Sequence, residues 1–89
     1  MKVYNYKSNQ TVVETKEYTA LLSYGVPQVI VCKEGHLLGG DTVLVNSKRY
    51  SNTTSKHRNA YLQTLNLDNY TVIPAFPEEI EEVTGLETR

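Results

Sequence analysis

Apolar and polar residues alternate along the first half of the chain with a period of two, which is the period of a β-strand. From Tyr18 to Tyr24 the even positions face one side and the odd positions face the other. Residues 28–32 are instead apolar and β-branched on both faces, which is typical of a central strand covered on both sides. The segments predicted to be strands are VYNYK, YTALLSY, QVIVC, TVLV and YTVI.

Glycine and proline separate these segments at intervals of about ten residues. Gly25 and Pro27 predict a turn or a bulge, and Glu34-Gly35 has the flexible backbone of a tight hairpin turn. A further break is expected at 39–41, and Pro74 is expected to end the last strand. Short strands at this spacing predict an antiparallel sheet or a small barrel.

The period changes after Asn52 from two to that of a helix. Thr53, Thr54 and Ser55 are all good N-cap residues, because a side-chain oxygen accepts the free N–H groups of a first helical turn. Taking about 100° per residue places three apolar residues on one face, with Thr54 and Arg58 beside them: Tyr61, Leu62 and Leu65. We therefore expect a helix from about residue 54 to about residue 65, packed on the sheet.

The last thirteen residues have the outline of a short acidic helix. Pro77 suits the first helical position, Glu78 and Glu79 suit the positive end of the helix dipole, and Gly85 suits the left-handed C-terminal position. Its apolar stripe is narrow, so weak docking or fraying is expected. The prediction is an α+β fold: a small twisted antiparallel sheet of five or six strands and one main helix in residues 1–76, followed by an acidic helix or tail in 77–89.

Composition adds a charge asymmetry to this picture. The 89 residues suffice for one small domain, and 39% hydrophobic with 21% charged residues is ordinary for a soluble globular protein. The net charge of −1 hides a local +4 in residues 47–58, which contain no acid, and a local −5 in residues 59–89. Positive charge is therefore concentrated beside the predicted helix start.

The residue types that carry catalysis or bind metals lack the necessary spacing. Cys32, His36 and His57 form no metal-binding motif, and pairing of Cys32 with either histidine is conceivable but has no support in the pattern. The glycines form no phosphate-binding loop, and paired carboxylates occur only in the acidic tail. We expect no enzyme activity, no metal and no cofactor. A single cysteine, no membrane-length apolar run and no signal-peptide pattern favour a cytoplasmic protein that does not contact membranes.

The stretch SKRYSNTTSKHR carries the candidate binding site. A helix N-terminus has unpaired N–H groups and a partial positive charge, both of which favour an anion. Here hydroxyl groups and cations surround it, and a tyrosine beside them suits stacking on a nucleic-acid base. The candidate residues for binding an anion or nucleic acid are Lys48, Arg49, Tyr50, Thr53, Thr54, Ser55, Lys56, His57 and Arg58.

A purely structural explanation of the same residues remains open. Serine and threonine before a helix commonly act only as caps, and Arg58 suits stacking over Tyr61 or pairing with an acid. His57 suits a packing or capping role, and Lys48 with Arg49 suits keeping a sheet edge soluble. A surface for a protein partner is a third alternative.

The pattern Tyr-Ser-x-Thr-Thr-Ser-Lys-His, from Tyr50 to His57, together with the earlier SYGVP, resembles a family of small bacteriophage and plasmid proteins classed as a domain of unknown function. The resemblance runs from about Val3 to Leu65. It implies an accessory protein of a mobile element that acts by binding.

The functional prediction is a non-enzymatic accessory protein that binds a phosphate-bearing partner, with nucleic acid preferred, through residues 47–58. Two alternatives remain: inhibition of a host protein, such as a defence or transcription factor, and sequestration of a signalling nucleotide. Assembly into a homo-oligomer is compatible with each of them.

Overall fold

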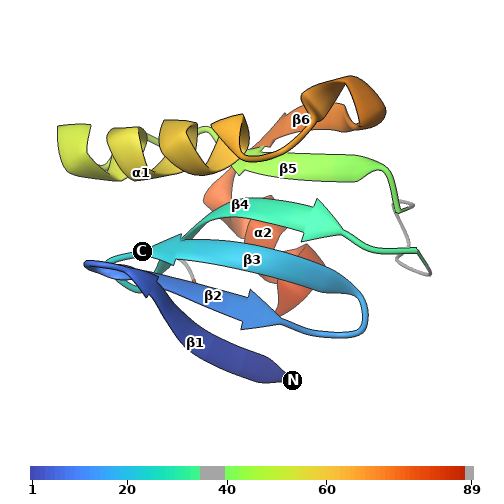
Figure 1. Ribbon diagram of the computed structural model, residues 1–89, viewed down its shortest axis with the longest axis horizontal. Coiled ribbons are helices and arrows are strands. Elements are labelled where there is room, and N and C mark those ends of the chain that lie inside the picture. The colour runs from blue at the N-terminus through green and yellow to red at the C-terminus, as the bar shows by residue number, and fades with distance from the viewer. Residues whose placement is uncertain (35–39, 88–89) are drawn as a thin grey trace.

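A computed structural model describes residues 1–34 and 40–87 of the chain as one six-stranded sheet with a helix on each face (Figure 1). The strands lie side by side in chain order, and the sheet is not closed into a barrel. The elements are β1 (Lys2–Lys7), β2 (Gln10–Glu14), β3 (Tyr18–Ser23), β4 (Val26–Cys32), β5 (Thr42–Asn46), α1 (Asn52–Gln63), the 3₁₀ turn η1 (Leu67–Asn69), β6 (Thr71–Ala75) and α2 (Pro77–Thr84). This confirms the predicted α+β class.

The last pair of strands is parallel, so the prediction of an all-antiparallel sheet is wrong there. β5 and β6 are joined by α1 and η1, which carry the chain back to the end of the sheet where β5 begins. A strand that follows such a helical crossover enters the sheet in the same direction as the strand before it. The other four pairs are antiparallel hairpins or hairpin-like pairs.

Two hydrophobic layers hold the helices to the sheet. The layer under α1 contains Val12, Leu21, Val29 and Val43, and Tyr61, Leu62 and Leu65 pack on it. The predicted apolar face of this helix is therefore confirmed. Burial in this layer raises the pKa of Tyr61 above its ordinary value of 10.0. β4 lies between β3 and β5 and is covered by both layers, as its apolar sequence predicted.

The C-terminal helix α2 docks firmly, which corrects the expectation of weak docking. Ile80 is 0% exposed and joins the layer that contains Ala20, Ile30 and Leu44. The N–H of Phe76 donates to Glu79 Oε1, and Gly85 ends the helix with a φ of 74°. The predicted roles of Pro77 and Gly85 at the two ends of the helix are confirmed. Val83 and Leu86 pack on the same layer, and the Tyr18 hydroxyl donates to the Thr84 carbonyl at 3.3 Å, so a narrow apolar stripe is enough to dock the helix.

Pro74 lies within β6 rather than ending it. The N–H of Thr71 donates to Asp41, and the carbonyl of Ala75 accepts from Ser47, so both residues face β5. Backbone groups alternate in direction along a strand, so Pro74 faces outward, where its missing N–H disturbs no pairing. A turn or a bulge was predicted at Gly25 and Pro27. The turn is present, with Gly25 at a φ of 79°, whereas Pro27 lies within β4, where the register with β3 shifts. The predicted Glu34-Gly35 turn and the break beginning at Gly39 extend outside the described residues.

Candidate anion-binding site

The loop between β5 and α1 is tied down by a buried asparagine at the end of β5. The side-chain amide of Asn46 donates to the Pro27 carbonyl at 2.9 Å and to the Tyr50 hydroxyl at 3.2 Å. Its carbonyl oxygen accepts from the N–H of Lys48 at 3.0 Å. Because Asn46 is fully buried, these bonds set the path of the chain into the helix.

The N-cap of α1 is Ser51, and the helix spans residues 52–63 rather than the predicted 54–65. The Ser51 hydroxyl oxygen accepts from the N–H of Thr54 at 3.1 Å. The prediction that Thr53, Thr54 or Ser55 forms the cap is wrong. The five residues from Ser51 to Ser55 are all capping types, so local preference alone does not choose between them. Burial of Thr54 against the sheet decides the position.

A buried polar network joins the first two turns of α1 to the end of β3. The Ser23 hydroxyl lies 3.2 Å from Thr54 Oγ1 and 2.7 Å from His57 Nδ1. The His57 ring in turn stacks on Tyr24, with centroids 6.0 Å apart. Ser23 is 1% exposed, so its hydroxyl is buried between the strand and the helix, and these contacts hold the first two turns of α1 in place.

Two other predicted site residues are also engaged within the protein. Arg58 is half-buried, and its guanidinium donates to the Asn46 carbonyl at 3.0 Å. Tyr50 is half-buried, and the amino group of Lys48 lies 5.1 Å from the centroid of its ring. Thr54 is 4% exposed. We therefore assign Arg58, Tyr50 and Thr54 to positioning α1 rather than to direct contact with a ligand.

The remaining predicted residues lie around the open first turn of α1. Asn52 and Thr53 are exposed, and no hydrogen-bond acceptor for their N–H groups lies within residues 1–34 and 40–87. The Arg49 guanidinium donates to Asn52 Oδ1 at 2.6 Å, which places its charge beside these amides. Lys56 is exposed one turn further along, and Ser55 is half-buried between them. The first turn contains no acidic residue.

Sequence reasoning missed Lys7, which the sheet brings to the same end of the molecule. Lys7 pairs with Gln10 across the first hairpin, and Gln10 pairs with Ser23, the residue bound to α1. The Lys7 amino group lies 5.3 Å from the centroid of the Tyr6 ring, which packs edge-on against Tyr61 of α1 at 5.6 Å. No local signal in the sequence joins residue 7 to residues 49–56.

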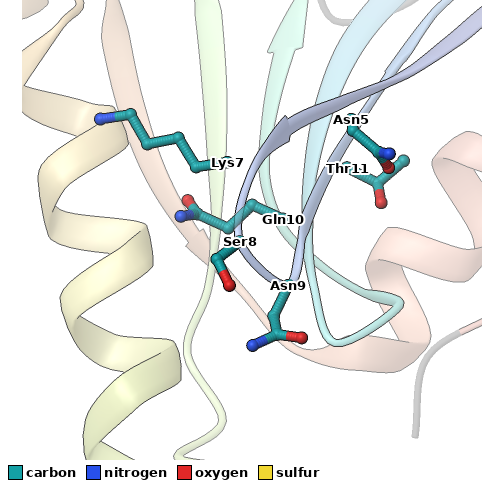
Figure 2. A pocket seen from close by; sticks show the side chains of 6 residues that line it. All are labelled: Asn5, Lys7, Ser8, Asn9, Gln10 and Thr11. Carbon is teal, nitrogen blue, oxygen red and sulfur yellow. The ribbon is translucent and has the colours of Figure 1, made fainter.

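A hollow of about 490 Å³ lies at the tip of this hairpin. Its lining residues are Asn5, Lys7, Ser8, Asn9, Gln10 and Thr11 (Figure 2). Figure 2 shows Lys7 and Gln10 directed toward the α1 side of the hairpin, whereas Asn5 and Thr11 point away from it. The side chains diverge, so they do not enclose a small molecule. Lys7 instead extends the cationic surface that begins at the first turn of α1.

The two described residues considered for metal or thiol chemistry lie at opposite ends of the sheet. Cys32 is buried opposite Tyr18 at one end, and His57 contacts Ser23 at the other. Burial raises the pKa of the Cys32 thiol, which disfavours the reactive thiolate. His36 lies outside the described residues, and the described part of the chain contains no cluster of three metal-ligating side chains.

Comparison of the chain with protein-family models, with curated proteins and with solved structures gives no match. The resemblance to phage and plasmid proteins therefore stays a prediction, and the site is argued from its own geometry. Neither helix in the described part of the chain has the length and apolar character that crossing a bilayer requires.

Proposed function

We propose that this protein is a non-enzymatic binding protein that receives a phosphate-bearing partner, with nucleic acid preferred, at the first turn of α1. One observation carries the proposal: Asn52 and Thr53 are exposed between Arg49 and Lys56, and their N–H groups have no acceptor in the described part of the chain. Residues 42–67 contain no carboxylate that would neutralise these charges from within the same segment. Free amides, a helix dipole and two cations together favour an oxyanion.

The energetics of α1 support this function. Cations near a helix N-terminus oppose the helix dipole and cost stability, by roughly 0.3–1 kcal/mol at an exposed position. Arg49 is such a cation, Lys56 adds a weaker effect from one turn further along, and the first turn has no acid to offset them. A bound phosphate would remove this unfavourable interaction, so ligand binding and helix stability are expected to rise together.

Nucleic acid is preferred over an isolated phosphate because an exposed aromatic ring lies at the same end of the molecule. Tyr24 is 51% exposed and stacks on His57 of α1. Single-strand binders commonly combine such rings with lysines that follow the phosphate backbone. Lys7 supplies a further cation on that path, whereas Glu14 and Glu17 lie at the opposite end of the hairpin strands. A cytoplasmic location, and an origin in a mobile element, are part of the same proposal.

The test is binding of a fluorescent single-stranded oligonucleotide, measured by anisotropy at several salt concentrations. Lys56→Ala is expected to weaken binding about fivefold and to reduce the slope of log affinity against log salt by about 0.7. Lys16→Ala is the matched control, because Lys16 is likewise exposed and lies in the turn between β2 and β3, at the far end. It is expected to change neither quantity.

Arg58→Ala separates positioning from direct contact. It is expected to lower thermal stability, because the buried carbonyl of Asn46 loses its donor, while the salt slope stays that of the parent protein. Absence of binding in the parent protein, or equal losses from Lys56→Ala and Lys16→Ala, would contradict the proposed site.

A further inference from the structure

The first strand forms one margin of the sheet, and its outer side is open (Figure 1). Five of its six residues are exposed, and only Tyr6 is half-buried. Val3 is 56% exposed and Tyr4 is 38% exposed. A strand that is exposed on both faces and along one edge can accept another strand beside it.

The hydrogen-bond pattern shows which backbone groups of β1 face outward. The Asn9 carbonyl accepts from Tyr24, and the N–H of Thr15 donates to Tyr18, so the odd residues of β2 face β3. The even residues of β2 therefore face β1, and Tyr4 lies opposite the even residue Val12. Val3 and Asn5 then direct their N–H and carbonyl groups away from the sheet.

The opposite margin, formed by β6, is interrupted at two successive outward positions. Pro74 faces outward and has no N–H to donate. The next outward group, the N–H of Phe76, already donates to Glu79. β1 has no proline, so the outward N–H groups of Val3 and Asn5 are available up to the irregularity in register between Asn5 and Lys7.

Charge on β1 selects the kind of strand that fits. The Lys2 amino group lies over the Tyr4 ring and that of Lys7 over the Tyr6 ring, each at 5.3 Å from the centroid. Both tyrosines lie on the face of the sheet that α1 covers, so Lys2 and Lys7 lie on that face too, one at each end of β1. A second copy paired antiparallel in the register that centres on Tyr4 would bring Lys2 beside Lys7 of its partner, because the shift in register after Asn5 places Lys7 on the face of Lys2, and this contact is repulsive.

We propose that the outer edge of β1 binds an extended acidic segment of a partner protein by strand addition. Carboxylates on one face of the incoming strand would meet Lys2 and Lys7, and β-branched side chains on its other face would cover Val3. Glu14 lies opposite Lys2 and partly offsets its positive charge, so Lys7 contributes more to the selectivity for an acidic strand. This surface shares Lys7 with the proposed nucleic-acid path but does not include the first turn of α1, and it requires main-chain pairing rather than phosphate.

The experiment titrates a labelled hexapeptide of alternating Glu and Val into the full chain and follows backbone amide shifts by NMR. Val3→Pro removes an outward N–H, and proline is tolerated at that position of an edge strand. It is expected to weaken binding about fivefold or more, whereas Val3→Ala, which keeps the N–H, changes affinity less than about threefold. Lys7→Glu is expected to weaken binding by more than Lys2→Glu.

Three further measurements keep the proposal falsifiable. A thermal melt establishes that Val3→Pro is folded, and Asn5→Pro provides a second outward position if it is not. Lys56→Ala is expected to leave peptide affinity unchanged, which distinguishes this edge from the proposed phosphate site. Equal binding of an alternating Lys-Val peptide, amide shifts confined to α1, or unchanged affinity in the folded proline variants would overturn the proposal.

Discussion

The two helices of the described chain have opposite chemistry at their N-termini. α2 begins with Pro77, Glu78 and Glu79, and the Glu79 carboxylate accepts from the backbone just before the helix. The first turn of α1 contains no acid and borders on Arg49 and Lys56. The acidic side chains of α2 thus compensate the positive end of its own dipole. In α1 no acid of the first turn does so, and two N–H groups have no acceptor in the described part of the chain.

The two helices also differ in how they are held. α2 is fastened by Ile80, which is fully buried in an apolar layer. The buried residue of α1 is Thr54, and polar contacts with Ser23 fix the position of this end of the helix. Apolar docking stabilises α2 as a cover for the sheet. Polar docking fixes the position of the first turn of α1, which is what a binding site needs.

The largest expected effect is the loss of Ile80. Ile80→Ala removes a fully buried side chain and is expected to cost about 2–5 kcal/mol of unfolding free energy, measured by urea denaturation. The matched change in α1 is Leu62→Ala, which removes a half-buried side chain and is expected to cost about half as much or less. Equal losses would break the contrast between apolar and polar docking.

Ser23→Ala tests the polar docking of α1 directly. The change removes the hydroxyl that contacts Thr54 and His57, and leaves the buried Thr54 hydroxyl with fewer partners. The expected cost is about 1–3 kcal/mol, again by urea denaturation. Ser8→Ala in the exposed first turn is the control and is expected to change stability by less than about 0.5 kcal/mol. A loss as small as that of the control would show that the network does not hold α1.

Charge changes in the first turns of the two helices have the smallest expected effects on stability, but they should differ clearly in their effect on oligonucleotide binding. Thr53→Asp places a carboxylate in the first turn of α1 and is expected to stabilise the protein by about 0.5 kcal/mol while weakening oligonucleotide binding several-fold. Glu79→Gln removes a charge from the first turn of α2 and is expected to destabilise by a similar amount with no effect on binding. Thermal melts and anisotropy on the same samples measure both quantities. Parallel changes in stability and affinity for Thr53→Asp would refute a phosphate site at that turn.

Residues close in sequence supplied most of the correct predictions. The alternation in residues 18–24 and the apolar run at 28–32 predicted strands that are present, because burial on one or two faces leaves a local signature. The ends of α2 were predicted because Pro77 and Gly85 have backbone preferences that act within one turn. The apolar face of α1 followed from helical spacing in the same way.

Tertiary contacts decided where the predictions failed. Ser51 became the cap because Thr54 met Ser23, which lies 31 residues earlier in the chain. The guanidinium of Arg58 donates to the Asn46 carbonyl in β5, so Arg58 is not part of the surface that we propose binds a ligand. The parallel direction of β6 followed from the path of α1 over the sheet.

The sequence by itself indicated both helices, five of the six strands and where the positive charge gathers, because these depend on residue type and short-range periodicity. It missed β2 (Gln10–Glu14), which only the pairing with β1 and β3 identifies. The tertiary structure alone decided which of those charges remain free, and that Lys7 joins them. Sheet pairing brings residues that are distant in sequence to one end of the molecule, and burial consumes some polar groups while leaving identical neighbours exposed. Which polar group bonds to which depends on distances between residues that are far apart in sequence, and a local sequence pattern does not contain those distances.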